Sequence, residues 1–63
     1  MTKEQLAEVA HRIRNPLNTI SVNAELARLQ IERHQDAEKI LLSLNRILQG
    51  CKDCSAQLDS LTE

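Results

Sequence analysis

The chain has 63 residues with no aromatic side chain, one glycine and one proline, which limits it to one small aliphatic domain and disfavours a β-rich fold. Its formal net charge of −1 arises from interspersed acids and bases, so nothing favours binding to nucleic acid or to a membrane surface. No apolar run approaches the roughly 18 residues of a membrane span, so we expect a cytoplasmic protein, or the cytoplasmic part of a larger one. Abundant Leu, Ala, Glu, Gln, Arg and Lys predict an all-α fold.

The first helix is predicted from a seam of apolar residues. They recur at alternating steps of 3 and 4, which places them along one side of a helix, as in coiled coils and four-helix bundles. The pattern predicts a helix over about residues 3–32. The seam consists of Leu6, Ala10, Ile13, Leu17, Ile20, Ala24, Ala27 and Ile31.

The segment ERHQD, residues 32–36, is polar and contains no apolar residue, so it predicts a turn over about residues 33–36. We expect Asp36 to cap the second helix, because its carboxylate can accept a hydrogen bond from an otherwise unpaired backbone N–H. His34 is interpreted as a solvated residue of this turn.

A second seam with the same alternation predicts a helix over about residues 37–62. Gly50 lies inside this helix, where it costs roughly 1 kcal/mol relative to alanine and is consistent with a close approach of two helices. The seam consists of Ala37, Ile40, Leu44, Ile47, Cys51, Cys54, Leu58 and Leu61.

Cys51 and Cys54 have the C-x-x-C spacing found in redox and zinc motifs. Both lie on the seam, where a small apolar side chain packs well, so we interpret them as reduced core cysteines. A zinc site would need two further ligands, and His11 and His34 belong to other faces or ends of the hairpin. The alternative is therefore a zinc site to which two copies of the chain contribute cysteines across a dimer axis.

So short a turn folds the two helices back on each other as an antiparallel hairpin. Two helices alone leave each seam half exposed, and pairing two hairpins into a four-helix bundle buries both seams. We therefore expect a homodimer. The alternative is one long coiled coil without the turn.

The stretch AHRIRNPLNTI, residues 10–20, places a polar patch beside the first seam. His11 and Asn15 are i and i+4 neighbours off the seam, so both can meet the same incoming group. Pro16 lacks a backbone N–H for the carbonyl of Arg12, which predicts a bend next to His11. A neutral imidazole on a solvated face is a nucleophile near neutral pH. Arg12 and Arg14 are cations able to meet an anionic phosphoryl group.

This stretch resembles the H-box of the dimerisation and phosphoacceptor domain of two-component sensor histidine kinases. The H-box reads His, an acidic residue, an aliphatic residue, a basic residue, Thr or Asn, Pro and Leu. The resemblance implies a hairpin that dimerises into a four-helix bundle, with His11 as phosphoacceptor, Asn15 positioning water for phosphatase activity and Pro16 bending the helix. The matching residues are His11, Ile13, Arg14, Asn15, Pro16 and Leu17.

Arg12 departs from the H-box, which has Glu or Asp directly after the histidine. An arginine accepts no proton, so it cannot act as the base, although it can stabilise an attached phosphoryl group. Glu8, three residues before His11, is a possible substitute. The alternatives are a non-catalytic homodimerisation module with a degenerate H-box, and a helical adaptor in which His11 is an ordinary surface residue.

Val22, Leu26 and Leu29 form a second apolar stripe on the outer side of the first helix. They either widen the contact with a neighbouring helix or form the docking surface for a response-regulator receiver domain, as the resemblance implies.

One glycine excludes the glycine-rich boxes of an ATP-binding kinase domain, so we expect no cofactor on this chain. By the resemblance, ATP is held by a separate kinase domain, in cis or in trans. His11 then attacks its γ-phosphoryl group and passes the phosphoryl group to a receiver aspartate.

Overall fold

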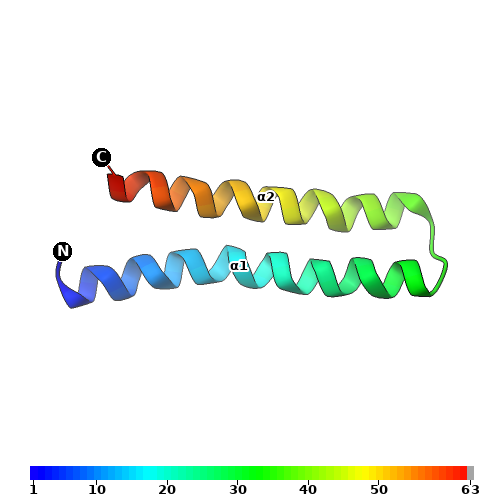
Figure 1. Ribbon diagram of the computed structural model, residues 1–63, viewed down its shortest axis with the longest axis horizontal. Coiled ribbons are helices and arrows are strands. Elements are labelled where there is room, and N and C mark those ends of the chain that lie inside the picture. The colour runs from blue at the N-terminus through cyan, green and yellow to red at the C-terminus, as the bar shows by residue number, and fades with distance from the viewer. Residues whose placement is uncertain (63) are drawn as a thin grey trace.

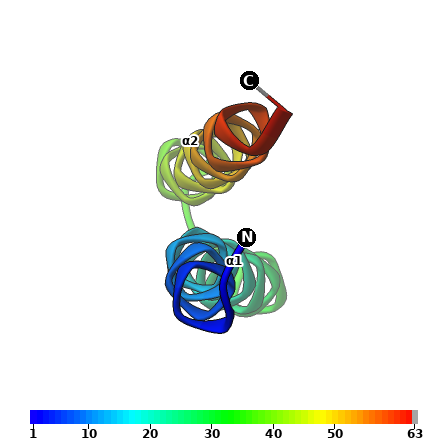
Figure 2. The same ribbon diagram turned by 90° about the vertical axis from the view of Figure 1, so that its left-hand side faces the viewer.

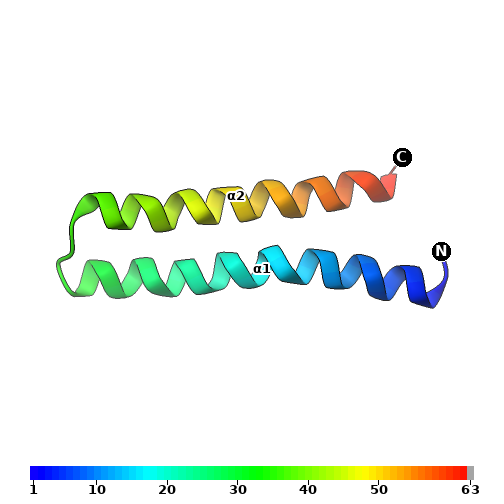
Figure 3. The ribbon, with the colours of Figure 1, turned by 180° about the vertical axis from the view of Figure 1, so that it is seen from behind.

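The structure, a computed structural model, describes residues 1–62 and their side chains through Leu61. It contains two helices, α1 (Lys3–Glu32) and α2 (Ala37–Thr62), and no strand within the described residues. The helices run antiparallel, with both termini at one end and the turn at the other (Figures 1 and 3). Viewed along its length, the hairpin is a single layer of two helices side by side (Figure 2). The all-α hairpin predicted from the two seams is confirmed.

The first turn of α1 begins with a capping box. Thr2 is the N-cap, and its Oγ1 accepts a hydrogen bond from the backbone N–H of Gln5 at 3.1 Å. The backbone N–H of Thr2 donates in return to Oε1 of Gln5 at 2.9 Å. These bonds satisfy N–H groups that the start of a helix otherwise leaves unpaired. From there α1 continues without interruption through Pro16.

The end of α1 is a Schellman turn. The N–H of Gln35 donates to the carbonyl of Gln30 at 2.9 Å, and the N–H of His34 donates to that of Ile31 at 3.1 Å. His34 therefore adopts a left-handed backbone conformation, with φ of 55°. Asp36 precedes α2 as expected, and its backbone carbonyl accepts from Ile40 at 3.3 Å. Its carboxylate forms no capping hydrogen bond with residues 1–62, so the predicted side-chain cap is wrong.

The contact between the helices uses only alternate members of each predicted seam. In α1 these are Ile13, Ile20 and Ala27, each seven residues from the next. A second row on α1, outside the predicted seam, completes the contact and consists of Pro16, Asn23 and Gln30. Together, the residues of the two helices that are buried or half-buried at this contact are Val9, Ile13, Pro16, Ile20, Asn23, Ala27, Gln30, Ile40, Ser43, Ile47, Gly50, Cys54 and Gln57.

The buried polar side chains of this contact, those of Ser43 and Asn23, have partners. Ser43 is 1% exposed, and its hydroxyl donates to Oε1 of Gln30 at 2.9 Å, which joins α2 to α1 near the turn. Asn23, which is also buried, donates from Nδ2 to the carbonyl of Thr19 at 2.8 Å. Satisfied in this way, they avoid the penalty of an unpaired buried polar group.

Gly50 marks a close approach of α2 to α1, as its place in the sequence suggested. A Cβ built at this position would lie 2.6 Å from Cγ1 of Ile20 and 3.2 Å from the carbonyl oxygen of Pro16. A side chain here would require Ile20 to shift and the Pro16 carbonyl to move by a few tenths of an ångström.

The other half of each seam is exposed, as expected for a hairpin alone. Leu17 and Leu58 are 52% and 51% exposed, respectively. On each helix, the exposed row of the seam is rotated from the contact row by the same angle. In an antiparallel pair, the two exposed rows therefore lie on the same side of the hairpin. We call this side the open apolar face. It comprises Leu17, Ala24, Ile31, Leu44, Cys51 and Leu58.

The two cysteines therefore differ. Cys54 is half-buried, and its thiol lies 3.8 Å from the carbonyl oxygen of Ile13, to which it donates. Cys51 is exposed on the open apolar face, because its position is rotated by about 60° around α2 from that of Cys54 on the contact row. Within the hairpin, the interpretation as a core cysteine is therefore correct for Cys54 but not for Cys51. Among the described side chains, no group of three or more His, Cys, Asp or Glu residues could hold a metal ion.

Candidate functional site

His11 lies on the side of α1 that faces away from α2, and its imidazole is exposed. Each residue turns the helix by about 100°, so two residues separate His11 from the contact row at Ile13 by well over a quarter turn. It makes no hydrogen bond or ion pair with any group that the structure describes. The ring is therefore free to meet an incoming group.

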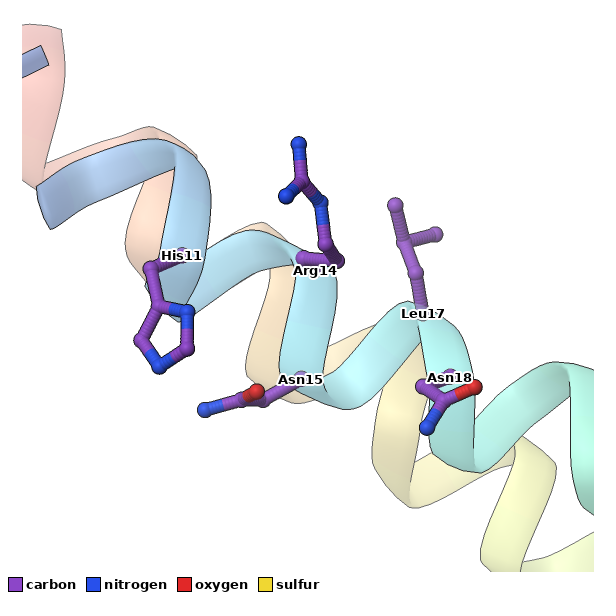
Figure 4. Close-up of a pocket in the computed structure, with 5 residues that line it drawn as sticks. All are labelled: His11, Arg14, Asn15, Leu17 and Asn18. Carbon is purple, nitrogen blue, oxygen red and sulfur yellow. The ribbon is translucent and has the colours of Figure 1, made fainter. Parts of the chain in front are cut away.

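A shallow open depression surrounds His11. It is lined by residues three, four, six and seven positions further along α1, which helix geometry gathers on one surface. In Figure 4, His11, Asn15 and Asn18 lie along one edge of α1, and Arg14 and Leu17 lie along the other. The depression thus combines a nucleophilic imidazole, one cation and two amides. Its lining residues are His11, Arg14, Asn15, Leu17 and Asn18.

The two arginines predicted to meet a phosphoryl group have different surroundings. Arg14 lines the depression of His11 and has no ion-pair or hydrogen-bond partner in the described part of the chain. Arg12 does not line it, and its guanidinium Nη2 instead donates to the carboxylate Oε1 of Glu8. Consecutive residues on a helix point about 100° apart, which sends Arg12 to a different flank from His11.

Glu8 and Arg12 lie in a second depression, between the start of α1 and the end of α2. Both side chains are largely exposed, Glu8 at 61% and Arg12 at 53%. A glutamate four residues before an arginine is the favoured order for an ion pair on a helix, so the sequence held the signal for this pair.

Asn18 is the lining residue that sequence reasoning missed. It follows His11 by seven residues, or about two helical turns, which returns it to nearly the same side of α1. That spacing was readable in the sequence. The H-box resemblance drew attention only as far as Leu17.

The outer apolar stripe continues from this site toward the turn. Val22, Leu26 and Leu29 are 59%, 37% and 38% exposed, so within the hairpin they do not contribute to the contact with α2. Leu29 follows His11 by 18 residues, or five full turns, and so returns to the same side of α1. His34, in contrast, lies exposed in the turn, at the far end of the hairpin.

Neither described helix has a segment long and apolar enough to cross a bilayer.

A two-helix hairpin that presents an exposed histidine beside a cation and two amides has the features of a domain that carries a phosphoryl group on histidine. The sequence matches the His Kinase A (phospho-acceptor) domain over residues 1–63, and the chain belongs to this family. The H-box resemblance is thereby confirmed. The family implies a phosphoacceptor and dimerisation role in histidine kinases of two-component signalling, and its domains typically dimerise and work with kinase and receiver partners. No curated protein and no solved structure matches the chain.

Proposed function

We propose that His11 accepts a phosphoryl group from ATP held by a separate kinase domain and passes it to an aspartate of a response-regulator receiver domain. The observation that carries this proposal is the exposed imidazole of His11, on the side of α1 that α2 leaves uncovered. Its depression includes Arg14, a cation without a partner among residues 1–62. The family membership of the chain supplies the chemistry for which this arrangement is suited.

In the first step, the lone pair of the Nε2 atom of His11 attacks the γ-phosphorus of ATP. The N–P bond forms, the bond from phosphorus to the bridging oxygen breaks, and ADP leaves with the electron pair. The imidazole ring becomes positively charged and then loses the proton on Nδ1. Arg14 compensates the negative charge of the transferred group, because charge-assisted bonds from guanidinium to phosphoryl oxygens are strong.

In the second step, a carboxylate oxygen of the receiver aspartate attacks the same phosphorus and the N–P bond breaks. The electron pair of that bond returns to His11, and Nδ1 takes up a proton again so that the ring leaves as a neutral imidazole. Asn15, one helical turn from His11, has the amide that can orient the attacking group or a water molecule beside the phosphorylated partner.

Glu8 is the carboxylate that we assign to the Nδ1 proton of His11. It stands three residues before His11, a spacing that makes two side chains neighbours on a helix. Each Cα–Cβ bond on a helix tilts toward the N-terminus, which is the direction of the turn that holds Glu8. Arg12, which occupies the position of the usual acidic residue, cannot accept this proton.

A second copy of the hairpin covers the open apolar face in this proposal, which gives a homodimeric four-helix bundle. The exposed leucines and isoleucine of that face favour burial, at about 25 cal/mol per Å² of apolar surface removed from water. His11 stays accessible because its position is rotated by about 120° around α1 from Leu17, the member of that face nearest to it in sequence.

The receiver domain docks on Val22, Leu26 and Leu29 in this proposal. These side chains form an exposed apolar stripe on α1, between His11 and the turn. A receiver seated there brings its aspartate toward the histidine without disturbing either the hairpin contact or the open apolar face.

The test is phosphorylation by phosphoramidate, followed by intact mass spectrometry and phosphorus NMR. We expect one acid-labile phosphoryl group on the wild-type chain and none on His11→Ala. His34→Ala is the matched control, because it removes the other histidine and leaves uptake unchanged. A folded dimer that takes up no phosphoryl group would instead support the non-catalytic dimerisation module, with Arg12 as the cause.

A further inference from the structure

Glu8 has two possible partners on α1, and the structure pairs it with only one of them. Its carboxylate accepts a hydrogen bond from Arg12, four residues later. His11, three residues later, is an equally close neighbour by helix geometry but is not bonded to it. A carboxylate held by a guanidinium is less available to an imidazole N–H.

We propose that Arg12 is a positioning residue that acts through Glu8: it withholds this carboxylate from His11 and so slows phosphoryl uptake. The inference rests on the proposed function of His11 and identifies a control on the same site. While Arg12 holds Glu8, the Nδ1 proton of His11 lacks a carboxylate acceptor. When Glu8 is released, it accepts this hydrogen bond and stabilises the positive charge that the ring acquires as the N–P bond forms.

The size of the effect follows from the exposure of the pair. Both side chains are more than half exposed, and ion pairs of this kind are weak. Release of Glu8 therefore changes the rate of uptake by about two- to five-fold rather than by orders of magnitude. Such an effect changes the rate of phosphoryl uptake without abolishing it.

The decisive variant is Arg12→Gln, because the proposal and a simple charge effect predict opposite results. Removing a cation next to His11 weakens attraction for an anionic donor, so charge alone predicts slower uptake. The proposal predicts uptake from phosphoramidate about two- to five-fold faster than in the wild type. In that reaction the P–N bond of the donor breaks, ammonia leaves, and the N–P bond to His11 forms. Arg12→Lys keeps the charge and the pairing and retains the wild-type rate.

Double substitution shows whether the effect passes through Glu8. Glu8→Gln alone slows uptake, and adding Arg12→Gln to it produces no acceleration. A matched control is available in the exposed Glu25–Arg28 pair, whose atoms Oε2 and Nη2 lie 3.0 Å apart about four turns further along α1. Arg28→Gln breaks a similar ion pair away from His11, and its rate of uptake equals that of the wild type.

A spectroscopic measurement tests the same link without phosphoryl transfer. Nitrogen-15 NMR of the His11 ring reports which ring nitrogen carries the proton. In Arg12→Gln we expect a shift toward the Nδ1–H form, and this shift disappears when Glu8→Gln is added. Unchanged ring signals in Arg12→Gln, or a gain in rate that persists without Glu8, would overturn the inference. Absence of uptake in every variant overturns the proposed function, whereas the ring signals still decide the link between Arg12 and His11.

Discussion

Gly50 of α2 faces the backbone carbonyl of Pro16 in α1, and a Cβ at position 50 would approach this oxygen to 3.2 Å. A close approach of the two helices therefore falls at the proline of the H-box, within two turns of His11. The carbonyl belongs to the backbone and cannot rotate aside as a side chain can. The missing side chain at Gly50 thus positions α2 against the part of α1 that carries the site.

Gly50→Ala is expected to destabilise the hairpin. Alanine gains about 1 kcal/mol of helix propensity, but overpacking against Ile20 and Pro16 costs about 1–3 kcal/mol. We expect a net loss of about 1 kcal/mol in the free energy of unfolding, measured by urea denaturation followed by circular dichroism. Asn45→Ala, at an exposed position of α2, is the control with little change. A more stable Gly50→Ala would show that the helices do not approach closely here.

His34→Gly is expected to stabilise the fold. The left-handed conformation at His34, with φ of 55°, costs a side-chain-bearing residue about 1–2 kcal/mol that glycine avoids. Part of this gain is lost to the greater flexibility of glycine in the unfolded chain, so we expect about 1 kcal/mol. The midpoint of urea denaturation should rise for His34→Gly and stay near the wild-type value for His34→Ala. Equal midpoints for the glycine and alanine variants would contradict the assigned turn.

Leu44→Glu tests the proposed dimer through the open apolar face. A glutamate buried between two hairpins would lack a partner, so we expect this variant to dissociate into monomers or lose helicity. Leu42→Glu, on the outer side of the same helix, is the matched control and stays dimeric. Sedimentation velocity measures both. A dimeric Leu44→Glu protein with wild-type helicity would place the interface elsewhere.

Leu26→Glu tests the docking stripe separately from the dimer. Leu26 is 37% exposed and lies outside both the hairpin contact and the open apolar face. We expect the dimer and phosphoryl uptake by His11 to remain at wild-type levels. Phosphotransfer to a cognate receiver domain should slow by at least ten-fold, measured by loss of label from the phosphorylated histidine. Loss of the dimer in this variant would assign Leu26 to a helix contact instead.

Helix positions and the candidate histidine were predictable because they depend on neighbours in sequence. Alternating steps of 3 and 4 reveal an apolar side of a helix before any packing is known. The same angular step of about 100° places His11 off that side. It also places Asn18, two turns after His11, on nearly the same side as the histidine. The pairing of Glu8 with Arg12 was readable for the same reason.

The sequence by itself therefore determined two helices, a short turn and an outward-facing histidine followed by Asn15 and Pro16, because periodicity and local chemistry specify all of them. Only the tertiary structure decided which row of each seam contacts the partner helix, since either row is apolar enough. It joined Ser43 to Gln30, left Cys51 exposed and brought Gly50 against Pro16. These results depend on how one helix is rotated and displaced against the other, and that choice minimises free energy over the whole contact rather than over any local stretch.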